Sequence, residues 1–243
     1  TTNVPDELLE ILRTTIREDR EAKDLLDPLL NNPFAFIWTD LASKTRFRTA
    51  GVVRRLCEEV LSAVEVDPPY ARDLADAAML VTESLDSARY SEEELINLRG
   101  LAWKARASAR RRLGDLKGAL DALDRASREF SLLHARAVAL ADIAYIRADI
   151  LSALGRLDEA AAAAQEATDA FVAQGRTRKY LQARLTTGAI AFRRRDLHGA
   201  LEIFLPILDQ AEADGDLAII AGASHNLGAT YVDLGEPTLA SKY

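Results

Sequence analysis

The segment AFRRRDLHGAL, residues 191–201, combines residue types that could bind a phosphate group. Arg193, Arg194 and Arg195 are consecutive, and His198 follows shortly after them. Arginine suits phosphate because its planar guanidinium can donate two parallel hydrogen bonds to one anion. The chain as a whole carries 38 acidic residues against 31 lysines and arginines, and its net charge is −7. Because a nucleic-acid-binding domain usually has a basic excess, nucleic acid is not the expected partner.

Residues that could carry out covalent chemistry are few, and their spacing does not form a catalytic site. Ser224 and His225 are adjacent, but neighbours on a helix point about 100° apart and do not face each other as nucleophile and base. Cys57, the one cysteine, lies among Val53, Leu56 and Val60, so we expect a buried structural thiol. The three histidines have no acids at ligand spacing. The sequence therefore predicts a protein without enzymatic activity, metal or cofactor.

The composition favours helices in a chain that does not enter a membrane. Alanine is abundant, whereas the 243 residues include only 12 glycines and 7 prolines. No apolar run approaches the roughly 18 residues that span a bilayer. The first residues contain neither an initiating methionine nor a signal-peptide core, so we expect a fragment or a processed chain. One cysteine fits a reducing compartment, and we expect a cytoplasmic location.

Four similar segments recur at steps of about 40 residues. They are RRLGDLKGAL (111–120), SALGRLDEAA (152–161), FRRRDLHGAL (192–201) and VDLGEPTLAS (232–241). Each reads as the end of one helix, a turn and the start of the next, and a turn glycine suits the left-handed backbone that ends many helices. Arg195 occupies this glycine position in the third segment. We therefore predict that its turn is either strained by about 1 kcal/mol or built differently.

The turns divide the chain into predicted helices. We expect them over 91–113, 115–130, 133–154, 156–173, 177–194 and 196–213, with a further helix starting near Asp216. Upstream, 49–66 and 70–88 read as another pair, because Pro68 and Pro69 separate them. Residues 1–48 fit no repeat and should contain two more helices, in VPDELLEILRTTIRE and DREAKDLLDPLL.

Aromatic residues cluster in the segment NNPFAFIWTDL, at Phe34, Phe36 and Trp38. The favoured interpretation is a cap that covers the open face of the first repeat. The alternative is a docking segment for a partner, because exposed aromatic side chains are typical anchors at interfaces.

The residues around the turns resemble the tetratricopeptide repeat (TPR), whose pattern is W-x2-L-G-x2-Y, a turn glycine and then A-x3-F. The fourth unit fits best, with Leu227, Gly228, Tyr231, Gly235 and Ala240, and the other units keep subsets of the pattern: Trp103, Ala107, Gly114 and Ala119; Ala148, Gly155 and Ala160; Gly188, Ala200 and Phe204. The 40-residue period is similar to that of the longer-repeat members in bacterial regulators and animal scaffold proteins.

The resemblance implies an all-α fold, a right-handed α-solenoid of antiparallel helix pairs with an N-terminal helical cap. The cap would be 1–48, a degenerate leading pair 49–90, and the TPR-like repeats 91–131, 132–174, 175–214 and an incomplete 215–243. Because the chain stops just after the fourth turn, we expect that the natural protein continues or that this end meets another subunit.

In this family the first helix of each unit lines a concave groove that binds peptides. Carrying those positions over predicts a groove of Lys104, Ser108, Arg111, Arg112, Asp142, Tyr145, Asp149, Gln182, Leu185, Arg193, His225, Ala229 and Asp233. Of the three consecutive arginines, only Arg193 should reach it. The resemblance implies a non-enzymatic scaffold for a partner protein or peptide. The alternatives are a sensor or regulatory module of a bacterial transcriptional or signalling protein, and a subunit that self-assembles through its solenoid ends. It also stays open that this polar face serves solubility alone.

Overall fold

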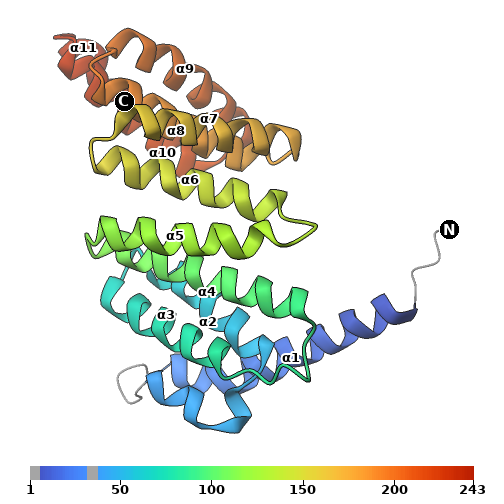
Figure 1. The fold of residues 1–243 in the computed structure, drawn as a ribbon. Coiled ribbons are helices and arrows are strands. Elements are labelled where there is room, and N and C mark those ends of the chain that lie inside the picture. Colours follow the sequence, from blue (N-terminus) through green and yellow to red (C-terminus); the bar gives the residue numbers. More distant parts are fainter. Residues whose placement is uncertain (1–5, 32–37) are drawn as a thin grey trace. The chain divides into compact units, whose positions relative to one another are not determined.

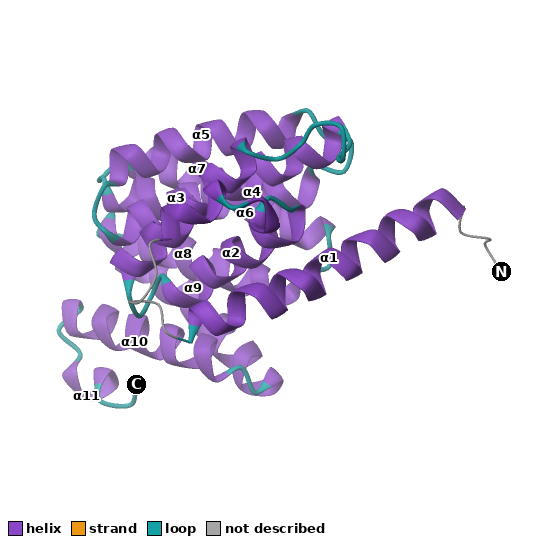
Figure 2. Cartoon of the chain, turned by 90° about the horizontal axis from the view of Figure 1, so that it is seen from below, coloured by secondary structure: helices purple, strands orange, loops and turns teal. Residues whose placement is uncertain are grey.

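The computed structural model describes residues 6–31 and 38–243, and all secondary structure in these ranges is helical (Figures 1 and 2). Two compact units are present, divided between residues 136 and 137. The first contains α1 (Asp6–Leu30), the short 3₁₀ helices η2 (Trp38–Ser43) and η3 (Thr45–Phe47), α2 (Ala50–Ala63), α3 (Pro68–Glu83), α4 (Glu92–Arg112) and α5 (Leu116–Ser131). The second contains α6 (Ala137–Ala153), α7 (Leu157–Ala173), α8 (Thr177–Arg193), α9 (Leu197–Asp214), α10 (Leu217–Asp233) and α11 (Pro237–Ala240).

Within each unit, helices that follow one another in the sequence pack against one another. This arrangement confirms the predicted all-α solenoid of helix pairs. The predicted repeat helices agree with α4 to α10 to within a few residues, apart from the start of α6. The cap, the leading pair and the first repeat belong to one compact unit, so the prominent boundary falls after the first repeat.

One prediction for the N-terminal region is wrong, because α1 is a single helix where we expected two. No glycine or proline interrupts residues 6–27, and Pro28 lies in the last turn, where it removes only one backbone hydrogen bond. The second half of α1 buries Ala22 and Leu26 in the core of the first unit. The first half extends away from α2 (Figure 1), and Ile11, a residue of the predicted apolar face, is 54% exposed.

The aromatic segment is part of the core as far as the structure describes it. Trp38 is buried, and its ring forms a T-shaped pair with that of Tyr70, with centroids 5.8 Å apart. Leu41, on the same short helix, is also buried against this cluster. The prediction that Trp38 is a docking residue is therefore wrong, because helix η2 packs it against α3. Phe34 and Phe36 lie outside the described residues.

The turns between paired helices share one backbone conformation. Gly114, Gly155 and Gly235 have φ of 82°, 77° and 78°, and Arg195 has φ of 65°. The amide of Asp196 donates to the Ala191 carbonyl at 3.0 Å, which is the bond that ends such helices in a left-handed turn. The turn at Arg195 thus has the same left-handed conformation as the three glycine turns. Of the two predicted alternatives, a strained turn is therefore the one observed.

Small residues let the helices of a pair approach closely. A Cβ added to Gly188 would lie 2.4 Å from the ring of Phe204, and one added to Gly100 would lie 2.6 Å from the ring of Phe130. Both rings are fully buried. Glycine in the first helix of these pairs therefore makes room for a phenylalanine from the second helix.

Candidate functional site

A pocket of about 300 Å³ opens on the first helices of three successive repeats in the second unit. Helix α8 contacts both α6 and α10, so residues from all three helices reach one surface. The pocket is lined by Tyr145 on α6, by Gln182, Leu185, Thr186 and Ala189 on α8, and by Ala218, Ile219 and Asn226 on α10. We call these eight residues the α8 groove. Tyr145, Gln182 and Leu185 are among the groove positions that the resemblance to the TPR implied, and they line one pocket here.

The α8 groove combines an apolar base with two amide groups that have no partner among the described residues. Leu185 approaches α10 so closely that a Cβ on Gly222 would lie 3.4 Å from its Cδ1 atom. The side-chain amides of Gln182 and Asn226 form no hydrogen bond with any residue in 6–31 or 38–243. Each amide therefore offers a donor and an acceptor to a ligand. Asn226 follows Thr186 by 40 residues, so extending the repeat phase to every lining position could have predicted it.

Charged residues beside the groove are engaged in contacts within the unit. Asp142 forms ion pairs with Arg176 Nη1 at 3.4 Å and Lys179 Nζ at 4.0 Å. The same Lys179 ammonium lies 5.6 Å from the centroid of the Tyr145 ring, which forms a T-shaped pair with Phe171. These contacts hold the Tyr145 ring in place on one wall of the groove. Asp142 was predicted to bind a partner, but its carboxylate is directed at two cations of α8 and the preceding turn.

The three consecutive arginines bind three different helices. Arg193 Nη1 donates to the carbonyl oxygen of Ser152 at 2.5 Å and to its hydroxyl oxygen at 3.1 Å. Ser152 lies in the last turn of α6, where carbonyl groups have no partner within the helix. Arg194 pairs with Asp158 at 2.5 Å, on α7, and Arg195 pairs with Asp233 at 2.5 Å, on α10.

The segment therefore tightens the contacts between neighbouring helices. Arg193, which we predicted to reach the groove, caps the end of α6 through its Nη1 group. The predicted groove residue Asp233 is likewise paired, whereas His225 is exposed on α10. Asp149 is half-buried on α6 and is also engaged.

The groove residues predicted in the first unit divide into three kinds. Lys104 lines a separate, smaller pocket between α2 and α4. Arg111 and Arg112 both pair with Glu65, with a distance of 3.4 Å for Arg111. Ser108 is buried, and its hydroxyl donates to the Lys104 carbonyl at 3.2 Å. The prediction for Ser108 is therefore wrong, because a small residue at this position packs inside the unit and its hydroxyl binds its own helix.

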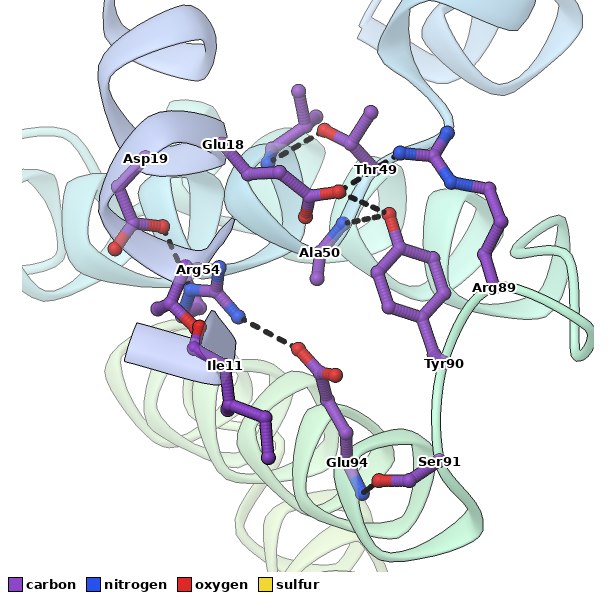
Figure 3. Close-up of polar contacts among 12 residues, drawn as sticks. Ile11, Glu18, Asp19, Thr49, Ala50, Arg54, Arg89, Tyr90, Ser91 and Glu94 are labelled. Carbon is purple, nitrogen blue, oxygen red and sulfur yellow. Dashed lines mark hydrogen bonds and ion pairs between the residues drawn. The ribbon is translucent and has the colours of Figure 1, made fainter. Parts of the chain in front are cut away.

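A buried cluster that the sequence did not reveal joins α1 to the rest of the first unit (Figure 3). The carboxylate of Glu18 is 4% exposed and accepts hydrogen bonds from Tyr90 Oη and Arg89 Nη2, both at 2.9 Å. The Tyr90 hydroxyl accepts in turn from the amide of Ala50 at 3.1 Å. Burial raises the pKa of Tyr90 to about 12. Because each of these hydrogen bonds joins residues of the first unit, we interpret the cluster as structural.

The described residues contain neither a reactive thiol nor a cluster of metal ligands. Burial raises the pKa of the Cys57 thiol to about 12, which keeps it protonated and unreactive. No group of three or more His, Cys, Asp or Glu side chains in 6–31 and 38–243 could hold a metal ion. Within the same ranges, no helix combines the length and the apolar character needed to cross a membrane.

Comparisons with known proteins support the architecture. No family model matches the chain, and no curated protein matches it. The structure is similar to the crystal structure of BtubC (BKLC) from P. vanneervenii, with a TM-score of 0.62 over 95% of this chain and 86% of that chain. The two sequences are 19% identical, so the likeness shows a shared fold and carries no further conclusion.

Proposed function

We propose that this protein is a non-enzymatic scaffold that binds a peptide segment of a partner protein in the α8 groove. The observation that carries the proposal is the pair of amides on two walls of one pocket, Gln182 and Asn226, which have no hydrogen-bond partner in the described part of the chain. A carboxamide can donate to a peptide carbonyl and accept from a peptide N–H, so it pairs with a backbone whatever the side chains are. Two such groups on adjacent helices would hold an extended segment across α8.

The remaining lining residues suit the side chains of such a segment. Leu185 and Ala189 supply apolar surface on α8, while Tyr145 presents an aromatic ring that two neighbouring residues hold in place. Rigid aromatic residues contribute much of the binding energy at protein interfaces. The groove is small, and its charged neighbours are already paired with one another, so we expect a short, largely uncharged segment. We also propose a cytoplasmic location, which suits the free thiol of Cys57.

Selection from a library of random peptides tests the proposal. The affinities of the selected peptides would be measured for the wild type and for the variant Gln182→Ala/Asn226→Ala. We expect a loss of about tenfold or more, since two hydrogen bonds contribute roughly 1–3 kcal/mol together. The matched control is Gln165→Ala/Gln210→Ala, which removes two exposed amides of α7 and α9. Equal losses for both variants, or no peptide selected at all, would contradict a binding role for this groove.

A further inference from the structure

The first half of α1 carries apolar side chains that remain exposed. Ile11, Leu12 and Ile16 are 54%, 48% and 59% exposed, although they lie within one and a half turns of a single helix. Single exposed apolar residues are common on protein surfaces, whereas a contiguous group of them marks an interaction site. Helix α1 belongs to the first unit and the α8 groove to the second, so this surface is separate from the one proposed above.

The exposed residues continue the stripe with which α1 packs into the first unit. Ala22 and Leu26, in the second half of α1, are buried in its core. Positions 11, 15, 18, 22 and 26 follow one another at steps of three or four, so they share one side of the helix. Thr15 needs no partner outside the helix, because its hydroxyl donates to the Ile11 carbonyl at 3.0 Å. A stripe that packs against one helix is suited to pack against another farther along.

The stripe is exposed because α2 begins too late to cover it. Helix α2 starts at Ala50, and Gly51 lies so close to α1 that an added Cβ would overlap the backbone of Glu18. The Tyr90 hydroxyl joins the same two places, since it donates to the Glu18 carboxylate and accepts from the Ala50 amide. The residues of α1 before Glu18 therefore extend beyond the start of α2, as Figures 1 and 2 show.

Arginine side chains border the exposed stripe. A hollow of about 320 Å³ beside it is lined by Arg13, Ile16, Arg17, Arg20, Glu21 and Asp24. Neither Arg17 nor Arg20 forms a hydrogen bond, an ion pair or a ring contact with any residue in 6–31 or 38–243. Arg13 approaches Glu10 at 3.8 Å, and both side chains are largely exposed, so this pair is weak. The guanidinium groups can therefore bind a ligand.

The carboxylates of α1 do not balance this charge next to Ile16. The acidic residues within four positions of it are Glu18 and Asp19, and both already bind arginines outside α1, at 2.9 and 2.8 Å. Glu21 and Asp24 follow Ile16 by five and eight positions, toward the other end of the hollow. The part of the hollow beside Ile16 is therefore basic, and its complement is acidic.

A second copy of this chain would not supply the acidic groups. In a symmetric pair the same patch of each copy meets at the interface. Two copies would therefore bring Arg13, Arg17 and Arg20 of one α1 toward the same residues of the other, and like charges repel. A different protein with acidic residues beside an apolar stripe fits the surface better.

We propose that the first half of α1 binds an acidic amphipathic helix of a partner protein. Its apolar side chains would cover Ile11, Leu12 and Ile16, and its carboxylates would contact Arg17 and Arg20. A helix matches the surface because its own apolar residues recur at steps of three and four, as they do along α1. Arginine binds carboxylates through charge-assisted hydrogen bonds, which select the acidic partner.

Two synthetic helical peptides serve as probes. The glutamate peptide is Ac-ELAELEAELAELEAELAEL-NH2, and the lysine peptide has lysine in place of every glutamate. Each is titrated into protein with isotope-labelled isoleucine methyl groups and followed by NMR. We expect the glutamate peptide to shift the Ile11 and Ile16 signals, and the lysine peptide to bind at least about tenfold more weakly. Added salt should weaken the binding of the glutamate peptide.

Two variants locate the binding. Arg17→Glu/Arg20→Glu should reverse the preference, so that the lysine peptide binds more tightly than the glutamate peptide. Ile11→Ser/Ile16→Ser should weaken the binding of the glutamate peptide by about tenfold or more. All four residues are exposed, so the fold should tolerate both changes.

The matched controls are Arg128→Glu and Val172→Ser, at exposed residues of α5 and α7, which should bind the peptides like the wild type. An unchanged preference in Arg17→Glu/Arg20→Glu, or a glutamate peptide that shifts neither Ile11 nor Ile16, would overturn the proposal. Sedimentation that shows a wild-type dimer, lost in Ile11→Ser/Ile16→Ser, would also overturn it, because a second copy would then be the occupant. Shifts confined to Ile219 would overturn it as well, while they would support peptide binding in the α8 groove.

Discussion

The guanidinium of Arg195 lies 2.5 Å from the carboxylate of Asp233, so the residue that replaces a turn glycine also ties its helix pair to the next one. Arg195 has two opposing effects on the stability of the fold. Arg195 has a φ of 65°, which costs a residue with a Cβ about 1–2 kcal/mol. An exposed ion pair returns about 0.2–1 kcal/mol.

Replacing Arg195 with glycine should therefore leave the free energy of unfolding unchanged or raise it by up to about 1 kcal/mol. Urea denaturation measures the change, and the control Asp233→Asn removes the ion pair while it keeps the strained backbone. The benefit of the glycine should grow in high salt, because salt screens the pair that is lost. A loss of more than about 1 kcal/mol in Arg195→Gly would show that the arginine stabilises the turn.

Removing the Tyr90 hydroxyl should destabilise the first unit by about 1–3 kcal/mol. Tyr90→Phe leaves the Ala50 amide without a partner and removes one of the two hydrogen bonds that the buried Glu18 carboxylate accepts. The control is Tyr243→Phe, at an exposed ring stacked on Tyr231, which should change stability by less than about 0.5 kcal/mol. Both would be measured by urea denaturation. Equal effects in the two variants would mean that the Glu18 cluster does not hold α1 in place.

Stability should decrease at high pH. Burial raises the pKa of Cys57 from 9.0 to about 12, and it raises the pKa values of Tyr70 and Tyr90 from 10.0 to about 12. Between these values the unfolded chain releases protons that the folded chain retains, so the free energy of unfolding falls as the pH rises. Below pH 9 these groups should not make the free energy of unfolding depend on pH. From pH 9 to 12 the free energy of unfolding should fall progressively.

The variants Cys57→Ala and Tyr90→Phe separate the contributions to this pH dependence. The first should remove the part of the slope that begins near pH 9, and the second should reduce the slope above pH 10. The measurement is urea denaturation at several pH values, and only the slopes are compared, because each substitution also changes stability at neutral pH. Unchanged slopes in both variants would contradict the burial of these groups.

Adding a methyl group at Gly188 should destabilise the second unit by about 1–3 kcal/mol, because its Cβ would overlap the ring of Phe204. The control Gly222→Ala introduces the same group on α10, where it meets Leu185 at an ordinary contact distance of 3.4 Å. That variant should be neutral or more stable by up to about 1 kcal/mol, since alanine favours a helix interior. Thermal unfolding distinguishes the two, and a stable Gly188→Ala would show that Phe204 moves aside at little cost.

The repeat period and its turn residues predicted most of the fold. Gly114, Gly155 and Gly235 identified the helix ends because a left-handed turn has a distinctive residue preference, and Arg195 kept its place in the series although its type differs. The same pattern did not reveal the continuous helix α1. Its length depends on which neighbours it packs against, and Glu18 meets Tyr90 across 72 residues of sequence.

The candidate site was predictable only in part. The resemblance to the TPR implied Tyr145, Gln182 and Leu185, because it assigns equivalent positions of successive first helices to one groove. It did not distinguish a residue that faces a pocket from one that binds a neighbouring helix. Arg193 has the right phase, yet a long side chain can reach the open carbonyl of Ser152, and only coordinates show which contact it makes.

Backbone recognition by Gln182 and Asn226 is the central claim, and a titration with modified peptides tests it most directly. A peptide selected for binding would be compared with versions in which single peptide bonds are N-methylated, using the wild type and Gln182→Ala/Asn226→Ala. N-methylation at the contacted bond removes the peptide N–H from which a carboxamide oxygen would accept a hydrogen bond. We therefore predict that the affinity of the wild type falls about tenfold, and that the affinity of the double variant falls no further. Equal losses in both proteins at every position would contradict the claim that these two amides bind the peptide backbone.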